Sequence, residues 1–268
     1  MLTGKDNATV KKYAALKDGR ERVAQGLFLL EGERLIADAV RAGAELEAVF
    51  IRGGGESKFS ELVSEISLKE PACAFFQVAD TLFPKLCGTV TPQGIVAAAR
   101  VPTTERPYGG GDALILDGVR DPGNLGTLIR SAAGFGFADV YLIDCADAYG
   151  PKAVRSSMSA IFHINLHVML GHSAIPCHSE RSEESSPYEI LNELKRQGVV
   201  LVAADMNGAD LKAYKRTGPV AVAVGGEARG ISKEVRAAAD SVLAIRTEGI
   251  ESLNAAVAGS IFMYALSQ

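Results

Sequence analysis

The chain has 268 residues, of which 47% are hydrophobic and 22% are charged, and its formal net charge is −4. This length suits two compact domains that each bury a core, and the composition is that of a globular protein. No apolar run reaches the roughly 18 residues of a membrane span, and the basic N-terminus lacks the apolar stretch of a secretory signal. The sequence therefore excludes a disordered chain, and it predicts a cytoplasmic protein with no membrane partner.

Charge is unevenly distributed along the chain. The first 22 residues hold six basic and three acidic side chains, although the chain as a whole is acidic. A local basic cluster is a candidate surface for nucleic-acid phosphates, but on its own it is also explained by a solvated helix face. The candidate RNA-binding residues are Lys11, Lys12, Lys17, Arg20 and Arg22.

The cysteines give no sign of a disulfide framework or a zinc ribbon. Cys73, Cys87, Cys145 and Cys177 show neither a CxxC pair nor a regular spacing, so we expect reduced, structural thiols. His172, Cys177 and His178 lie close together in sequence but match no usual ligand spacing. We therefore expect no metal.

Short apolar runs alternate with helical patterns in the first part of the chain. Strands are predicted at 28–30, 48–51, 74–78 and 95–101, helices near 34–42 and 60–66, and a helical turn near 82–86. This alternation predicts a small α/β domain. Residues 101–111 contain two prolines and three consecutive glycines without a periodic pattern, which indicates a linker. We therefore divide the chain into domains at 1–105 and 106–268.

The second part of the chain alternates in the same way. Strands are predicted at 113–116, 140–143, 199–203, 220–224 and 242–245, with helices between them. Such uninterrupted apolar strands are typical of a parallel sheet covered on both faces, where ligands bind at the carboxyl ends of the strands. Residues 171–187 are polar and aperiodic, so we expect an inserted, mobile surface loop there.

Three strand-to-helix junctions in the second domain are rich in glycine and polar residues. In the first, LDGVRDPGNLGTLIRSAAGFG at 116–136, a helix from Asn124 onward would place an apolar stripe on the sheet. The stripe consists of Leu125, Leu128, Ile129 and Ala132. Gly126 would lie one turn before Arg130 and leave room for a phosphate at the guanidinium. For an isolated motif, the more usual explanation is that Asn124 caps the helix and Arg130 forms a surface ion pair.

The second junction, VAVAVGGEARGIS at 220–232, surrounds one carboxylate, that of Glu227, with Gly225, Gly226 and Gly230. Glycines allow a backbone to approach a ligand closely, and they are also used simply to make a tight turn. The pattern does not match G-x-G-x-x-G, and no acidic residue follows at the dinucleotide spacing. The sequence therefore does not favour a nicotinamide site.

The third junction leads through Ser252 and Asn254 into an apolar C-terminal helix that extends to Leu266. Ser252 is a natural N-cap, and the free N–H groups after it are suited to an anion. Asn254 offers both a donor and an acceptor. Capping alone accounts for Ser252 and leaves Asn254 unexplained.

Together these junctions resemble the three motifs of the SpoU family, RNA 2′-O-ribose methyltransferases of the SPOUT superfamily. The resemblance covers Ala113–Gln268, and its most specific elements are Asn124 with Arg130, the Gly225-Gly226-Glu227 turn and Ser252-Leu253-Asn254. The basic helix and the string FLLEGERL at 28–35 are similar to the family's substrate-binding domain. Two substitutions depart from the family pattern: Arg246 stands where proline is usual, and Ser159 where glycine is common.

The resemblance implies an α/β fold in which a small ribosomal-protein-like α/β substrate-binding domain precedes a trefoil-knotted domain with a parallel sheet. It also implies a homodimer, for which the C-terminal helix offers the stripe Val257, Ile261 and Tyr264, with Ala258 and Gly259 permitting close approach. The implied binding residues for S-adenosylmethionine are Ala204, Val224, Gly225, Gly226, Ile245 and Leu253. The implied catalytic residues are Asn124, Arg130, Glu227, Ser252 and Asn254.

The predicted activity is therefore methyl transfer from S-adenosylmethionine to a ribose 2′-hydroxyl of RNA rather than DNA, with 23S ribosomal RNA as the expected substrate. Transfer RNA is the alternative substrate. A ribosome-associated protein without turnover would be expected to lack Arg130, Asn254 or the motif glycines, and an enzyme of small nucleotides would be expected to carry a dinucleotide fingerprint. Because a guanidinium stays protonated, we expect Arg130 to hold phosphate and the developing oxyanion, with a phosphate oxygen or water taking the proton.

Overall fold

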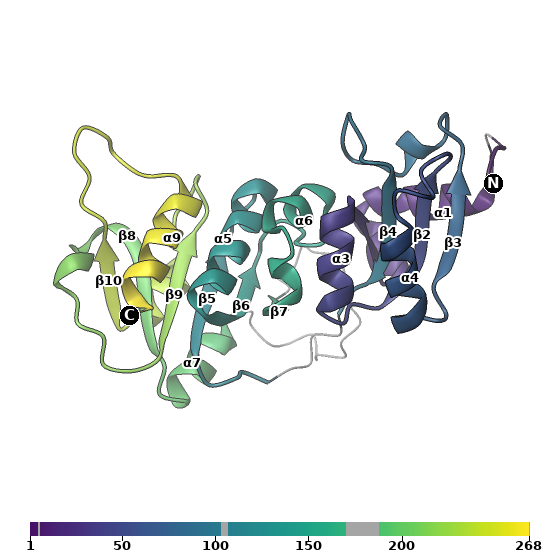
Figure 1. The fold of residues 1–268 in the computed structure, drawn as a ribbon. Helices are drawn as coiled ribbons and strands as arrows, with labels where there is room; N and C mark the ends of the chain where they lie inside the picture. Colours follow the sequence, from purple (N-terminus) through teal and green to yellow (C-terminus); the bar gives the residue numbers. More distant parts are fainter. Residues whose placement is uncertain (5, 103–106, 170–187, 268) are drawn as a thin grey trace. The chain divides into compact units, whose positions relative to one another are not determined.

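The structure is a computed structural model that describes residues 1–4, 6–102, 107–169 and 188–267. It contains two compact units (Figure 1): unit 1 is Met1–Thr103 with Tyr149–Phe162, and unit 2 is Thr104–Ala148 with His163–Gln268. The predicted insertion at 171–187, with its three candidate metal ligands, lies outside the described residues, as does the predicted boundary after residue 105. Within the described ranges, no helix combines the length and apolar character needed to cross a membrane.

Unit 1 is built on a four-stranded sheet with the order β1-β4-β2-β3. The strands are β1 (Leu27–Glu31), β2 (Leu46–Arg52), β3 (Ala74–Val78) and β4 (Ile95–Arg100). β4 runs antiparallel to both β1 and β2, and β2 pairs in parallel with β3. The four predicted strands are therefore confirmed.

Helices accompany the sheet of unit 1. They are α1 (Ala8–Ala14), η1 (Ala15–Lys17), α2 (Gly19–Gln25), α3 (Glu33–Arg41), α4 (Ser60–Lys69) and η2 (Phe83–Lys85). Alternate strand residues such as Leu29 and Phe50 share a core with Tyr13 and Leu16 on one side of the sheet. α3 contacts β1, β4 and α4. Unit 1 is thus a small α/β fold, as the alternating pattern predicts.

A second segment of the chain covers the edge strand of unit 1. This segment contains α6 (Pro151–Ser157) and η3 (Ala160–Phe162), and α6 contacts β1. The buried ring of Phe28 in β1 lies 5.0 Å from the ring of Tyr149 and 6.2 Å from that of Phe162, measured between centroids. Covering an edge strand in this way removes an exposed pairing surface, and it explains why this segment belongs with unit 1.

Unit 2 has a six-stranded sheet in which every described pairing is parallel, with the order β10-β8-β9-β5-β6-β7. The strands are β5 (Asp112–Asp117), β6 (Phe137–Ile143), β7 (Asn165–Met169), β8 (Val200–Asp210), β9 (Val220–Gly225) and β10 (Ser241–Ala244). Sequence reasoning did not predict β7. Its polar Asn165 and His167 interrupt the apolar run that marks the inner strands.

Helices lie on both faces of this sheet. α5 (Pro122–Phe135) and α9 (Ala255–Leu266) pack together on one face (Figure 1), while α7 (Glu189–Arg196), α8 (Lys233–Ala238) and η4 (Leu211–Ala213) complete the unit. Residues of α7 and α8 share a core with inner strand residues such as Ile115 and Ala223. The predicted parallel sheet with two covered faces is confirmed.

Both motif helices begin at positions other than those predicted. α5 begins at Pro122, because Asp121 is its N-cap and accepts a hydrogen bond from the backbone N–H of Asn124. α9 begins at Ala255, because Asn254 is its N-cap and accepts from the N–H groups of Ala256 and Val257. The predictions that Ser252 caps the C-terminal helix and that Asn124 starts the first one were therefore wrong. The predicted apolar stripe of α5 is buried as expected.

The amino-terminal end of the same sheet contains a buried polar cluster around Asp139 of β6. Its carboxylate accepts hydrogen bonds from the N–H of Gly109 (3.1 Å), from Asn165 Nδ2 (3.2 Å) and from His167 Nε2 (2.9 Å). The His167 ring stacks on the ring of Tyr141 at 4.3 Å. Burial raises the pKa of Asp139, but the hydrogen bonds from His167, Gly109 and Asn165 outweigh it, so the pKa lies below the ordinary value.

Candidate functional site

The three motif loops start at one edge of the unit 2 sheet. β5 and β9 are neighbours that run in parallel, and Asp117 at the end of β5 pairs with Gly225 at the end of β9. The loops that follow these strands carry Asn124 and Glu227, and the loop after β10 carries Asn254. The carboxyl ends of parallel strands are where α/β folds bind ligands. The sheet topology therefore brings the three motifs together.

A chain of hydrogen bonds joins the three motifs. The side-chain oxygen of Asn254 is engaged by the first N–H groups of α9, so its Nδ2 is turned outward and donates to Asn124 Oδ1 at 3.1 Å. Asn124 in turn donates from Nδ2 to Glu227 Oε1. These partners fix the orientation of both amides. The donors of Asn254 and Asn124 thus both point toward Glu227. Glu227 is exposed, and its second carboxylate oxygen has no hydrogen-bond partner among the described residues.

Asp117, at the end of β5, holds the loop of the second motif through two hydrogen bonds. Its backbone oxygen accepts from the N–H of Gly226 at 2.9 Å, and its buried carboxylate accepts from the N–H of Ser232 at 2.7 Å. Through these two groups, Asp117 holds both ends of the loop that carries Glu227. Sequence reasoning did not single out Asp117. The signal for it was a lone carboxylate at the end of a buried apolar strand.

The glycines of the second motif are required by the loop itself. A Cβ on Gly225 would lie 2.0 Å from the carbonyl carbon of Gly230, and one on Gly226 would lie 2.1 Å from the oxygen of Gly118. The loop closes through a hydrogen bond from the Gly230 N–H to the Gly226 oxygen at 2.8 Å. Tight packing of backbone on backbone therefore accounts for Gly225 and Gly226, and neither glycine is by itself evidence for a bound cofactor.

Arg130 and Ser252 lie apart from this hydrogen-bonded chain. Arg130 follows Asn124 by six residues on α5, a rise of about 9 Å along the helix. Its side chain is exposed and has no hydrogen bond or ion pair among the residues that the structure describes. Among the described residues, Arg130 therefore does not form the surface ion pair of the alternative explanation. Ser252 is exposed and, within the described ranges, likewise without a hydrogen bond.

The loop from β10 to α9 combines apolar side chains with backbone N–H groups that have no partner among the described residues. The side chains of Ile245 and Leu253 at its two ends are half-buried, and Ile250 is 56% exposed. None of the backbone N–H groups of residues 247–253 has a hydrogen-bond partner in the described part of the chain. Apolar surface beside free backbone donors and acceptors is the combination that cofactor sites use. These residues therefore fit the predicted ligand.

Two other residues predicted to bind the cofactor lie on neighbouring strands. The pairing of β10 with β8 jumps from Val242 opposite Ala203 to Leu243 opposite Ala209. Ala204 is therefore the first residue of a stretch that has no partner in β10. Val224 is the penultimate residue of β9 and is buried. In the sheet order, β8 lies between β10 and β9. Ala204 is therefore on the strand next to β10, and Val224 is on the strand that leads into the Glu227 loop.

The predicted RNA-binding residues lie in the first helices of unit 1. Lys11, Lys12 and Arg20 are exposed and pair with acidic neighbours: Lys11 with Asp6 at 2.7 Å, Lys12 with Glu47 at 2.8 Å and Arg20 with Asp18 at 3.7 Å. Lys17 is exposed as well. Such exposed pairs are weak and leave the cations available to another anion.

The prediction that Arg22 binds RNA was wrong. It is only 7% exposed, and its Nη1 donates to the backbone oxygen of Leu16 at 2.7 Å. Arg22 thus holds η1 against α2 and is too buried to contact RNA. Its place on the inner face of α2 was not visible in a count of charges.

The fold and the site define an α/β protein whose three motif loops gather at the carboxyl edge of a parallel sheet, and which carries a smaller mixed-sheet unit built mainly from its N-terminal residues. The chain matches the SpoU rRNA Methylase family over residues 113–264 and the MRM3-like substrate binding domain over residues 7–97. The chain therefore belongs to the SpoU rRNA methylase family, and it is a methyltransferase.

Relatives and solved structures agree with this assignment. The chain is 30% identical to the 23S rRNA (guanosine(2553)-2′-O)-methyltransferase RlmP of Bacillus subtilis, over 97% of this chain and 96% of that protein. It is 31% identical to the mitochondrial rRNA methyltransferase 3 of Mus musculus, over 91% and 68% of the two chains. The SpoU methyltransferase AviRb of Streptomyces viridochromogenes, solved with its cofactor AdoMet, superimposes with a TM-score of 0.80 at 26% identity, covering 97% and 96%.

Proposed function

We propose that this methyltransferase transfers the methyl group of S-adenosylmethionine to a ribose 2′-hydroxyl of 23S ribosomal RNA. The observation that carries the proposal is the chain of hydrogen bonds from Asn254 through Asn124 to Glu227, which unites three distant motifs at one sheet edge. The 2′-O-methyltransferase activity and 23S rRNA substrate of the Bacillus subtilis relative support the same assignment. RNA, rather than DNA, is the substrate, since the reaction requires a 2′-hydroxyl.

The reaction places modest demands on the protein. S-adenosylmethionine supplies an activated methyl group, so alignment of the ribose oxygen with that group is the main requirement. The loop from Ile245 to Leu253 would hold the cofactor. Glu227, fixed at one oxygen by Asn124, presents its free oxygen for a hydrogen bond from the ribose. Arg130 has no partner among the described residues, and its guanidinium is available to bind a phosphate of the target nucleotide and to stabilise the developing negative charge.

We also propose the trefoil knot in unit 2 and a homodimer formed through α9. Val257, Ile261 and Tyr264 are 48%, 39% and 57% exposed, which makes an uncovered apolar stripe on this helix. The prediction that Gly259 belongs to this surface was wrong. A Cβ on Gly259 would lie 2.4 Å from Leu128 Cδ2, so this glycine faces α5 inside the unit. A monomeric mass in light scattering at micromolar concentration would contradict the dimer. The cytoplasm, where ribosomes are assembled, is the proposed location.

The decisive experiment is a methyl-transfer assay with the full chain, labelled S-adenosylmethionine and a 23S rRNA transcript free of modifications. Incorporation of label that maps to one 2′-O-methylated nucleotide is expected. Transfer RNA from the same source serves as the competing substrate. Methylation of transfer RNA alone would overturn the 23S assignment, and cofactor binding without any transfer would favour a binding protein.

A further inference from the structure

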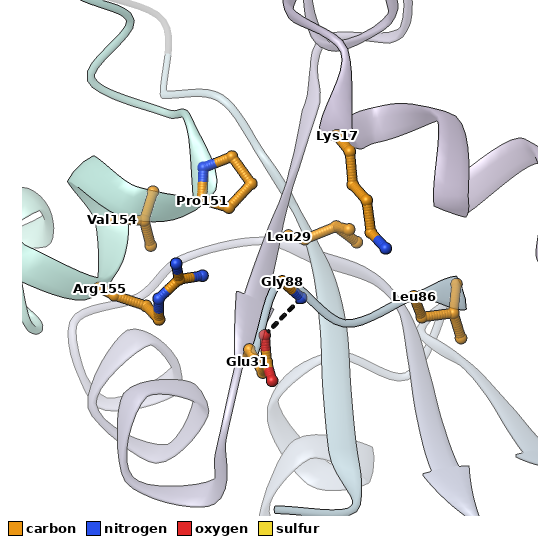
Figure 2. A pocket seen from close by; sticks show the side chains of 8 residues that line it. All are labelled: Lys17, Leu29, Glu31, Leu86, Gly88, Pro151, Val154 and Arg155. Atoms are coloured by element: carbon orange, nitrogen blue, oxygen red, sulfur yellow. Dashed lines mark hydrogen bonds between the residues drawn. The ribbon is translucent and has the colours of Figure 1, made fainter. Parts of the chain in front are cut away.

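Unit 1 contains a pocket that lies outside the methyl-transfer site. Figure 2 shows it between β1, the loop after η2, the end of η1 and the start of α6. Its apolar walls include Leu29, Leu86 and Val154, and the cations Lys17 and Arg155 enter it from two sides. All of these residues belong to unit 1. Arg155 comes from the segment that follows β6 in sequence, so the pocket exists only because that segment returns to unit 1.

The pocket has one carboxylate, and its oxygens already have partners. Glu31 Oε2 accepts from the N–H of Gly88 at 2.8 Å, and Oε1 accepts from the hydroxyl of Thr89. By contrast, Lys17 and Arg155 make no hydrogen bond or ion pair within the described part of the chain, although Arg155 is half-buried. A partly buried guanidinium without an acceptor is a costly arrangement unless a ligand provides one.

The backbone is shaped to admit this guanidinium. A Cβ on Gly88 would lie only 2.7 Å from Arg155 Nη1 and 3.4 Å from Pro151 Cβ. The absence of a side chain at Gly88 thus lets the guanidinium lie directly against the loop. The same glycine donates its N–H to Glu31. One residue therefore positions both the carboxylate and the cation of the pocket.

We propose that the mouth of this pocket binds one backbone phosphodiester of the RNA substrate, between the half-buried Arg155 and the exposed Lys17. The inference rests on the proposed function, because it assigns part of the RNA contact to unit 1. A guanidinium matches two phosphate oxygens in a planar fork, while an ammonium adds a point charge. The apolar walls offer no donors or acceptors with which to read a base edge, so the contact fixes position rather than sequence.

The charge of the pocket favours an anion. Two cations and one carboxylate leave a formal charge of +1, and the RNA substrate of the proposed function presents its anions as backbone phosphodiesters.

The test measures binding of the full-length protein to an unmodified 23S rRNA transcript at several salt concentrations. Arg155→Gln should raise Kd by about five- to tenfold and lower the slope of log affinity against log salt by about 0.7 to 0.9, the value of one phosphate contact. Arg41→Gln is the matched control, because Arg41 is an exposed arginine of unit 1 that pairs with Asp38 outside the pocket. Equal effects of the two substitutions would overturn the proposal.

Two further variants test the geometry. Gly88→Ala changes no charge but displaces the Arg155 guanidinium, so it should weaken RNA binding in the same direction; affinity equal to wild type would overturn the proposal. If Lys17 and Arg155 hold the same phosphate, Lys17→Gln combined with Arg155→Gln should cost less than the product of the single effects. Independent, multiplicative losses would show that they do not share one phosphate.

These outcomes are separable from a failure of the proposed function. Wild-type protein that neither binds nor methylates the transcript would refute the function itself. Wild-type protein that methylates it, with Arg155→Gln behaving like Arg41→Gln, would refute the pocket alone. Calorimetric binding of S-adenosylmethionine should be unchanged in every pocket variant, because the motif loops lie in unit 2.

Discussion

Two polar networks lie at opposite ends of the same parallel sheet, and they differ in how completely their groups are satisfied. At the amino-terminal end, Asp139 is buried and accepts from three donors. At the carboxyl end, Glu227 is exposed, and only one of its oxygens has a partner among the described residues. A closed network contributes stability, whereas an open one keeps hydrogen-bonding capacity for a ligand. The two ends should therefore respond to mutation in opposite ways.

The largest effect should come from Arg130 at the open end. Arg130→Ala should lower single-turnover methyl transfer by about two orders of magnitude or more, the scale of losing a donor to a developing oxyanion. Arg130→Lys should rescue poorly, because an ammonium cannot reproduce a planar fork. Affinity for S-adenosylmethionine should stay nearly unchanged by calorimetry. A wild-type rate for Arg130→Ala would remove the first motif from the catalytic step.

The matching experiment at the closed end is Asp139→Asn. An amide cannot accept from all three donors that the carboxylate engages, so the free energy of unfolding should fall by about 2 kcal/mol. Urea denaturation measures the loss. Methyl transfer at a temperature where the variant is folded should remain that of wild type. A strong loss of rate without a loss of stability would break the contrast between the two ends.

Asn254 sharpens the comparison because it both caps α9 and donates to Asn124. Asn254→Ser should keep the cap, and with it most of the stability, but a hydroxyl is too short to reach Asn124, so methyl transfer should fall by about tenfold. Asn254→Ala should lose the cap as well and cost about 1 kcal/mol of stability. Equal rates for Asn254→Ser and wild type would mean that the asparagine is only a cap.

The smallest expected effect is a pH dependence of stability. Because the folded-state pKa of Asp139 lies below its ordinary value, its contribution is fully present above that ordinary value, which is about 3.9. The contribution is lost as the pH falls through the folded-state pKa. The melting temperature should therefore fall less steeply between pH 6 and pH 3 for Asp139→Asn than for wild type. Parallel curves would contradict this account.

The sequence was sufficient for most strands and for the three motif loops, because apolar runs and glycine-rich turns are local signals. The sequence was insufficient where contacts with residues distant in sequence determine a residue's position or role. Ser252 and Asn254 are both good caps, and the helix begins after the one that also bonds Asn124. Arg22 carries the same charge as its exposed neighbours, and only the packing of α2 buries it. Arg155 gains a role only because α6 packs with unit 1.

The composition of unit 1 from two separate stretches of chain has a consequence for biosynthesis. Phe28 is buried beneath the rings of Tyr149 and Phe162, so the N-terminal unit cannot be completed until β5, α5 and β6 have also left the ribosome. Folding of the first unit during translation must wait for part of the second. For the same reason, the unit cannot be exchanged between enzymes as a single cassette cut after the linker, because such a fragment would leave Phe28 and the edge of β1 uncovered.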